Sequence, residues 1–334
     1  TPPAADLALR GGAIYTADGA RSWAQTIAID DGRIVYVGTD AGASAHIGPQ
    51  TQVVDLKGRM VVPGFQDVHI HPISGGIEAN GCDLNAATSV EEYVATIKKF
   101  AEDHPNDTWI KGGGWSMAAF GPGALARKEL IDAVVPDRPV ILWSRDGHTT
   151  WVNSKALEAA GINSDTKDPP DGRIDRDPKT GEAVGSLQEG ASGLVADKVP
   201  ADTDATRDAG LRYAIRMLNG YGITGIQDAS VNEEDLKTYR RLDDAGELSL
   251  RVVGSIWWDR DLGLEQIEDI KRLRGEHTKG RIDAGTVKIM QDGVMENYTA
   301  VLTEPYHVEG SPTGIPMVDP ERLKQAVAAL DAKG

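Results

Sequence analysis

The chain has 334 residues, of which 40% are hydrophobic and 26% are charged, and its formal net charge is −16. This length and composition exclude a structureless chain and leave room for several domains, or for one large α/β barrel with an appendage. The acidic balance argues against nucleic acid and against an anionic membrane as partners. Because Cys82 is the one cysteine, the sequence also excludes an internal disulfide framework and a Cys-based zinc knuckle.

The N-terminal 60 residues have the pattern of a small β domain, residues 1–60. Asp31-Gly32 lies between two alternating runs and predicts a β-hairpin. The expected strands, separated by Gly and Asp, are Leu7–Leu9, Ala13–Thr16, Thr26–Ile29, Ile34–Val37 and Thr51–Val54.

Residues 61–334 form the expected second domain. At its start, the apolar stretch Met60–Val62 continues through Pro63-Gly64 to His71 and predicts a buried strand of a parallel sheet. Further strands are expected at Trp109–Gly112, Val140–Ser144, Ile223–Gln227, Leu250–Ile256 and Thr286–Met290. Helices are expected after a capping box at Ser89–Glu92, at Ser154–Ala160, Ala205–Leu218, Glu233–Asp244 and Leu262–Leu273, and after the N-cap Asp319. Asp165–Gly185 is rich in Asp, Pro and Gly and predicts a surface loop or hairpin.

The repeated order of strand and then helix predicts an α/β fold with a parallel sheet. Counting the core strands yields about four βα units, with the strands near Trp109 and Val140 in an insertion over about residues 73–200. A closed barrel needs eight units, so we expect this chain to be the front part of a longer protein.

His69-x-His71, at the end of the expected strand, is the sharpest chemical feature of the sequence. The strand period of two places both imidazoles on one side, where two neutral nitrogens can converge on one cation. The alternative is a pair of core histidines, each of which would need a buried partner.

The run from Val62 to Pro72, with its His-x-His, resembles the first-strand motif of the amidohydrolase superfamily of metal-dependent hydrolases. Segments 145–157, 222–228 and 287–293 are similar to the branch that contains N-substituted formamide deformylase and its YtcJ-like relatives. The resemblance extends from about Leu7 to Gly334. It implies a (β/α)8 TIM-type barrel, of which about the first four βα units are present, together with a small β-sandwich domain.

The resemblance also implies a metal centre, and the ligands that it implies within this chain are His69, His71 and Lys288. Lys288 lies near the end of the fourth core strand, and in the two-metal members of the superfamily a lysine there is carboxylated and bridges two Zn²⁺ ions. An unmodified ammonium cannot bind a cation, whereas a carbamate offers two anionic oxygens. The alternative for Lys288 is an ion pair with Asp292 or Asp228. The family's general-base Asp is expected beyond Gly334, so no catalytic base is assigned.

Several other residues are candidates for substrate binding or for positioning the ligands. Asp67 flanks the His-x-His motif, and His148 follows an apolar strand. Glu189 either lines the site or is an ordinary carboxylate at a helix start. The remaining candidates are the strand-end residues Asp228 and Asp292, which could equally make turns, and Trp115 and Trp151, which could wall an apolar pocket or belong to the core.

These features predict an enzyme that hydrolyses carbon–nitrogen bonds other than peptide bonds, in an amide or N-substituted formamide, with a metal-activated water. Two alternatives remain open: a non-catalytic binding or assembly module, and a metal-dependent esterase. We expect a small-molecule substrate and no nucleic acid or membrane partner, and a homo-oligomer is left open. The expected compartment is the cytoplasm, or the periplasm or exterior if a leader was removed before Thr1.

Overall fold

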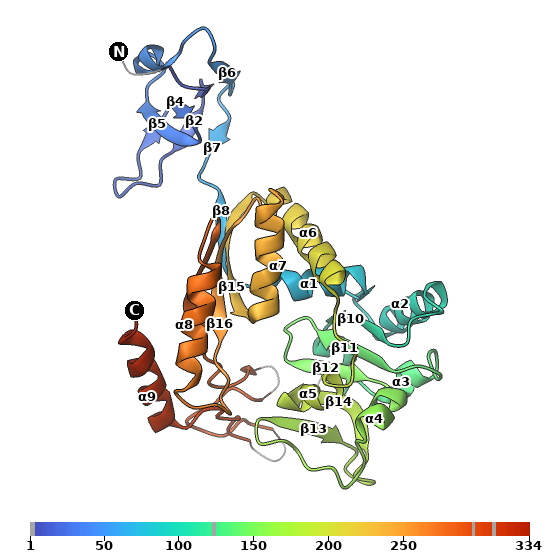
Figure 1. The fold of residues 1–334 in the computed structure, drawn as a ribbon. Helices are drawn as coiled ribbons and strands as arrows, with labels where there is room; N and C mark the ends of the chain where they lie inside the picture. The colour runs from blue at the N-terminus through green and yellow to red at the C-terminus, as the bar shows by residue number, and fades with distance from the viewer. Residues whose placement is uncertain (1–3, 122–124, 296–297, 309–311) are drawn as a thin grey trace. The chain divides into compact units, whose positions relative to one another are not determined.

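The computed structural model describes residues 4–121, 125–295, 298–308 and 312–334. The chain divides into two compact units, Thr1–Phe65 and Gln66–Gly334 (Figure 1). Within the described ranges, no helix combines the length and the apolar character that crossing a membrane requires.

The first unit consists of two small sheets, with strand orders β5-β4-β1-β6 and β3-β2-β7. Its strands are β1 (Leu7–Arg10), β2 (Ala13–Tyr15), β3 (Trp23–Ala24), β4 (Thr26–Asp30), β5 (Arg33–Gly38), β6 (Gln52–Asp55) and β7 (Met60–Val61). The predicted hairpin is confirmed: β4 and β5 pair antiparallel, with Asp30 opposite Arg33. Asp31 and Gly32 have φ angles of 47° and 69°, as a two-residue turn with positive φ at both central positions requires.

The second unit contains the remaining elements. Its strands are β8 (Phe65–Ile70), β9 (Cys82–Asp83), β10 (Ile110–Trp115), β11 (Val140–Ser144), β12 (Thr149–Val152), β13 (Gly172–Arg176), β14 (Ala183–Glu189), β15 (Ile223–Val231), β16 (Arg251–Trp257) and β17 (Ile282–Lys288). Its helices are α1 (Pro72–Asn80), α2 (Val90–Asp103), α3 (Lys128–Asp132), α4 (Ser154–Ala160), α5 (Gly193–Ala196), α6 (Asp204–Gly220), α7 (Glu233–Asp244), α8 (Gln266–His277) and α9 (Pro320–Asp331). The predicted α/β class is therefore confirmed, whereas a closed eight-stranded barrel stays a prediction.

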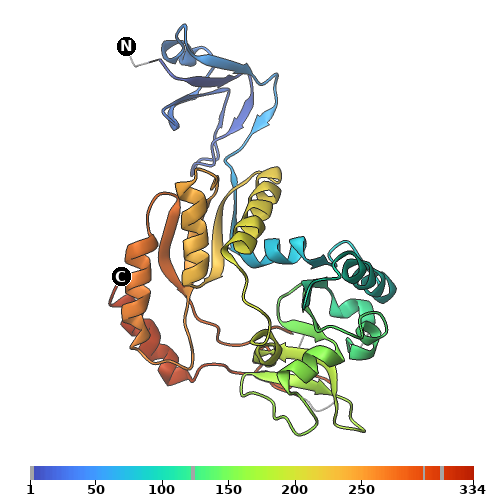
Figure 2. The same cartoon turned by 45° about the vertical axis from the view of Figure 1, so that its right-hand side comes forward.

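One sheet of the second unit has the order β17-β16-β15-β8, and β16 pairs in parallel with both of its neighbours. Helices α6, α7 and α8 lie along one face of this sheet (Figures 1 and 2). Leu236, Val252 and Ile270 belong to the apolar cluster that fills the space between the helices and the strands. The carboxyl ends of the strands therefore share one edge of the sheet, where barrel enzymes place functional groups.

The expectation of a buried strand before His71 is wrong. The stretch breaks at Val62–Gly64, and β8 forms the edge of its sheet, with Phe65 57% and Val68 70% exposed. A strand with a neighbour on one side only leaves its side chains open, in contrast to the central strands of a parallel sheet.

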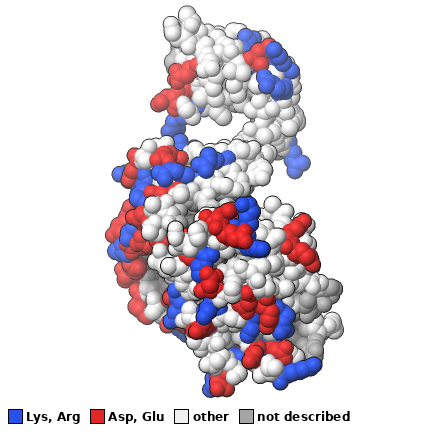
Figure 3. Space-filling model, turned by 90° about the vertical axis from the view of Figure 1, so that its right-hand side faces the viewer, with Lys and Arg blue, Asp and Glu red and all other residues white. Residues whose placement is uncertain are grey.

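A second sheet, with the order β13-β14-β12-β11-β10-β9, lies between α1 and α6 in the sequence. It is mixed: β11 runs parallel to β10 and antiparallel to β12. The predicted hairpin within Asp165–Gly185 is confirmed as the antiparallel pair β13 and β14. On the face drawn in Figure 3, the acidic and basic side chains of this unit are interspersed.

Helices α1 and α6 cross at two glycines, and this crossing holds the segment after His71 in place. A methyl group on Gly76 would come within 2.0 Å of the Gly210 carbonyl oxygen, and one on Gly210 within 2.8 Å of the Ile77 side chain. Glycine at both positions lets the two backbones approach more closely than any other residue would allow.

We predict that Gly76→Ala destabilises the protein by about 1–3 kcal/mol, because the added methyl overpacks the helix crossing. The matched control is Gly275→Ala in α8, where no atom lies within 4 Å of the added methyl. That change is expected to stabilise the helix by about 0.5–1 kcal/mol. Urea unfolding measures both free energies, and equal effects of the two substitutions would contradict the close crossing.

Candidate functional site

Strands β8, β15, β16 and β17 border a cavity of about 940 Å³ in the second unit, to which β16 contributes Trp257. His69 and His71 come from the end of β8, Asp228 from the neighbouring β15 and Lys288 from the end of β17. The structure thus brings together three predicted metal ligands and one predicted strand-end carboxylate. They share the cavity because neighbouring parallel strands end at the same edge of the sheet.

The two histidine rings face each other edge to face, with centroids 5.6 Å apart and an angle of 85° between their planes. His71 Nδ1 lies 3.4 Å from Asp228 Oδ1. Asp228 is 2% exposed, and its other oxygen accepts a hydrogen bond of 2.8 Å from the Tyr239 hydroxyl. A buried carboxylate that is itself held by a hydrogen bond can orient a histidine whose other nitrogen is directed at a cation.

His69 has the electrostatic surroundings of a neutral imidazole. Partial burial lowers its pKa, and the positive charges of Lys288 and His71 lower the pKa further. No described residue forms a hydrogen bond with its ring, so its nitrogen lone pair is available. The neutral ring is the form that binds metal ions.

Lys288 lines the same cavity, and no carboxylate of the described residues lies within 4.0 Å of its ammonium group. The alternative ion pair with Asp228 or Asp292 is therefore not formed. Among the described residues, no three His, Cys, Asp or Glu side chains are grouped closely enough to hold a metal ion. Two imidazoles fit zinc by donor chemistry, and a third donor at Lys288 requires its conversion to a carbamate.

His148 enters the cavity from the turn between β11 and β12 and binds a carboxylate. Its Nδ1 lies 2.8 Å from Glu189 Oε2, and the Glu189 side chain is 2% exposed. The other Glu189 oxygen accepts a 2.5 Å hydrogen bond from Thr299 Oγ1. The hydrogen bond with Glu189 is the main cause of the raised pKa of His148, which therefore stays protonated to higher pH than a free histidine.

Glu189 has an unusual backbone conformation for its side chain. Its φ angle of 50° lies in the left-handed region, and it ends β14 just before Gly190. Such strain in a non-glycine residue persists only where the surroundings hold it, and it concentrates at functional sites. Of the two sequence interpretations, the structure favours a residue that lines the site, because Glu189 is at the cavity wall and paired with His148.

Two further predicted site residues have local roles. Asp292 lines the cavity, and its carboxylate accepts a 2.9 Å hydrogen bond from the Val301 backbone. Asp67 accepts a 3.0 Å hydrogen bond from the His69 backbone N–H and does not line the cavity.

Trp115 and Trp151 do not wall the pocket, and that part of the prediction is wrong. Both are fully buried, with ring centroids 5.9 Å apart in a core cluster of the second sheet. Their indole N–H groups donate to the carbonyls of Leu142 and Arg127, so neither ring needs a ligand as partner. Trp143 of β11, in contrast, lines the cavity.

Sequence reasoning missed Glu78 and Arg260. Glu78 lies on α1, and Arg260 forms an ion pair with Asp171; both Glu78 and Arg260 line the cavity. The glycine run Gly112-Gly113-Gly114 is a sequence signal for Glu78. Gly113 leaves room for the Glu78 side chain, since a methyl group on Gly113 would lie 2.6 Å from Glu78 Oε2. A run of glycines in a strand marks a close approach, although it does not say of what. No comparable signal marks Arg260.

Comparison with known proteins places these features in context. The sequence profile described as "Amidohydrolase family" matches residues 52–334. The chain is 30% identical over 330 residues to YtcJ of Bacillus subtilis, a match that covers 97% of this chain and 61% of that protein. It is 28% identical over 249 residues to N-substituted formamide deformylase of Arthrobacter pascens, covering 73% of this chain and 46% of the relative. The chain thus spans roughly half to six tenths of these relatives.

The fold resembles a solved structure of an uncharacterized metal-dependent hydrolase from Pyrococcus horikoshii. The TM-score is 0.70 at 24% sequence identity, and the match covers 98% of this chain and 63% of the other. At 24% sequence identity, this similarity shows a shared fold and nothing further.

We predict that Glu189→Gln lowers the pKa of His148, because a neutral amide does not stabilise the imidazolium as a carboxylate does. The His148 ring signals in a pH titration followed by nuclear magnetic resonance measure this change. Glu182→Gln, an exposed substitution in the turn between β13 and β14, is the control and should leave the titration unchanged. An unaltered His148 titration in Glu189→Gln would contradict the pairing.

Proposed function

The chain belongs to the amidohydrolase family, as its resemblance to the YtcJ-like branch predicts, and from this premise we propose that it acts as a metal-dependent hydrolase of carbon–nitrogen bonds. The observation that carries the proposal is the meeting of His69, His71, Asp228 and Lys288 at one cavity. In this proposal the four strands β8, β15, β16 and β17 are the front half of a (β/α)8 barrel.

His69 and His71 are proposed to hold the more buried metal, and Lys288, carboxylated, to bridge two ions, which we take to be zinc. A divalent metal there supplies Lewis acidity, which lowers the pKa of water toward about 7 and polarises a carbonyl group. Asp228 positions His71, and Tyr239 positions Asp228.

The protein's own polar groups have separate tasks in this proposal. The hydrogen bond with Glu189 raises the pKa of His148, and in its protonated form His148 presents an N–H donor toward the substrate. Such a donor can bind the carbonyl oxygen or the leaving nitrogen of an amide. Thr299 fixes the orientation of Glu189 and thereby that of His148.

The proposed substrate class is an amide-like small molecule, such as an N-substituted formamide. The similarity to N-substituted formamide deformylase supports this choice, and the cavity of about 940 Å³ is large enough for a substituted amide. The acidic surface supports a small-molecule substrate over nucleic acid.

We predict that His69→Ala lowers metal-dependent turnover of an N-substituted formamide by more than about 100-fold and lowers the bound metal measured by mass spectrometry. His307→Ala is the control, because His307 is exposed and lies outside the cavity. Undiminished activity and metal content in His69→Ala would overturn the ligand assignment.

We predict that protein incubated with ¹³C-bicarbonate and zinc shows a carbamate carbon signal that disappears in Lys288→Met. Lys271→Met removes an exposed lysine from α8 and should leave the signal intact. Equal signals in wild type and Lys288→Met would contradict carboxylation at Lys288 without depending on turnover.

A further inference from the structure

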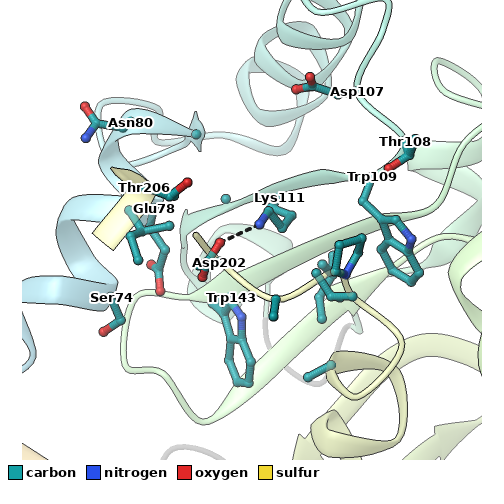
Figure 4. A pocket seen from close by; sticks show the side chains of 18 of the residues that line it. Ser74, Glu78, Asn80, Asp107, Thr108, Trp109, Lys111, Trp143, Asp202 and Thr206 are labelled. Carbon is teal, nitrogen blue, oxygen red and sulfur yellow. Dashed lines mark hydrogen bonds and ion pairs between the residues drawn. The ribbon is translucent and has the colours of Figure 1, made fainter. Parts of the chain in front are cut away.

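A second cavity, of about 650 Å³, lies beside the first in the same unit. It is bounded by α1, the end of α2, β10, β11 and the segment that leads into α6. Figure 4 shows Glu78, Lys111, Asp202, Trp109 and Trp143 around it. Glu78, Trp143 and Asp202 also line the first cavity, so the two cavities share a wall.

The basic side chains of this cavity are already paired. Lys111 Nζ lies 2.7 Å from Asp202 Oδ1, the contact drawn as a dashed line in Figure 4. Arg207 forms an ion pair of 3.7 Å with Asp235. No described residue forms an ion pair or hydrogen bond with the carboxyl group of Glu78, nor with that of the exposed Asp107, so the unpaired side-chain charges of the described lining are acidic.

Glu78 is held at this position by the close approach of α1 to β10. Its Oε2 lies against Gly113, where a methyl group would come within 2.6 Å of it. Burial and the nearby charge of Asp83 raise the pKa of Glu78 to about 7. A partly buried carboxylate without a partner is costly, and a bound cation would supply the missing partner.

Part of the cavity wall is apolar and aromatic, whereas Thr206 and Asp202 lie nearer to Glu78 (Figure 4). The indole rings of Trp109 and Trp143 lie on the cavity, and Phe100 and Ile141 line it as well. Aromatic faces bind the carbon skeleton of a ligand and also attract organic cations. An inorganic cation would leave most of this apolar wall without a ligand.

We propose that this second cavity binds a small organic amine in its protonated form, with the ammonium group at Glu78 and the apolar substituent between Trp109 and Trp143. This inference rests on the proposed function: hydrolysis of the amide by water releases an amine that takes up a proton, and the site would hold this protonated product, because the cavity adjoins the metal-binding residues through the shared wall. The amine part of the substrate is then aromatic or alkyl and not acidic.

Calorimetric titration of the full chain with benzylamine tests the proposal, and benzyl alcohol serves as the uncharged probe of similar shape. We expect saturable binding of benzylamine at one site and binding of benzyl alcohol that is at least about tenfold weaker. Glu78→Gln should weaken benzylamine binding by about tenfold, because the charge-assisted hydrogen bond is lost. Glu91→Gln, on the exposed first turn of α2, is the matched control and should bind as wild type does.

Absence of benzylamine binding, equal binding of the alcohol, or unchanged binding in Glu78→Gln would each overturn the proposal. The comparison of the two probes needs no variant, so it decides the matter even where Glu78→Gln fails to fold. The same titration with His69→Ala separates the two proposals, because amine binding should survive there while turnover is lost. Binding without turnover in wild type would contradict the proposed function and leave the amine site standing.

Discussion

The placement of β8 beside β15 is the constraint on which the site depends. These strands are adjacent in the sheet although the whole second sheet and helices α1 to α6 lie between them in the chain. Because β8 ends in His69-x-His71 and β15 carries Asp228, their pairing alone brings His71 and Asp228 within 3.4 Å. The close crossing of α1 and α6 at Gly76 and Gly210 holds these two strands together, because α1 follows His71 directly and α6 leads into β15.

Local patterns predicted much of this arrangement. Helix α7 spans Glu233–Asp244, the predicted range, and α4 stops at Gly161, whose φ of 68° closes the helix in a left-handed conformation. The capping box at Ser89 and Glu92 forms as expected. The strand period alone predicts that the two histidines lie side by side, and the count of parallel strands predicts the position of Lys288.

What the sequence could not provide depends on contacts between distant segments. The hydrophobic character of Phe65 and Val68 suggests burial, but exposure is decided by the position of β8 at the sheet edge. From the sequence, Trp115 and Trp151 could line a pocket or belong to the core. Their burial and their hydrogen bonds to the carbonyls of Leu142 and Arg127 place them in the core. The partnership of His148 with Glu189 joins a turn to the end of a strand, and no spacing rule connects them.

The site combines His69, whose pKa is lowered, an unpaired lysine and His148, whose pKa is raised, around one cavity, with an amine-binding cavity proposed next to it. This division of charge suits hydrolysis of an amide, in which a carbonyl is activated at one end and an amine departs at the other. The most direct test of the account is an anomalous difference map, recorded at the zinc absorption edge, from crystals grown with zinc. The account predicts peaks between His69, His71 and Lys288, with electron density that extends the lysine as a carbamate. Peaks at other residues, or none at this cavity, would contradict it.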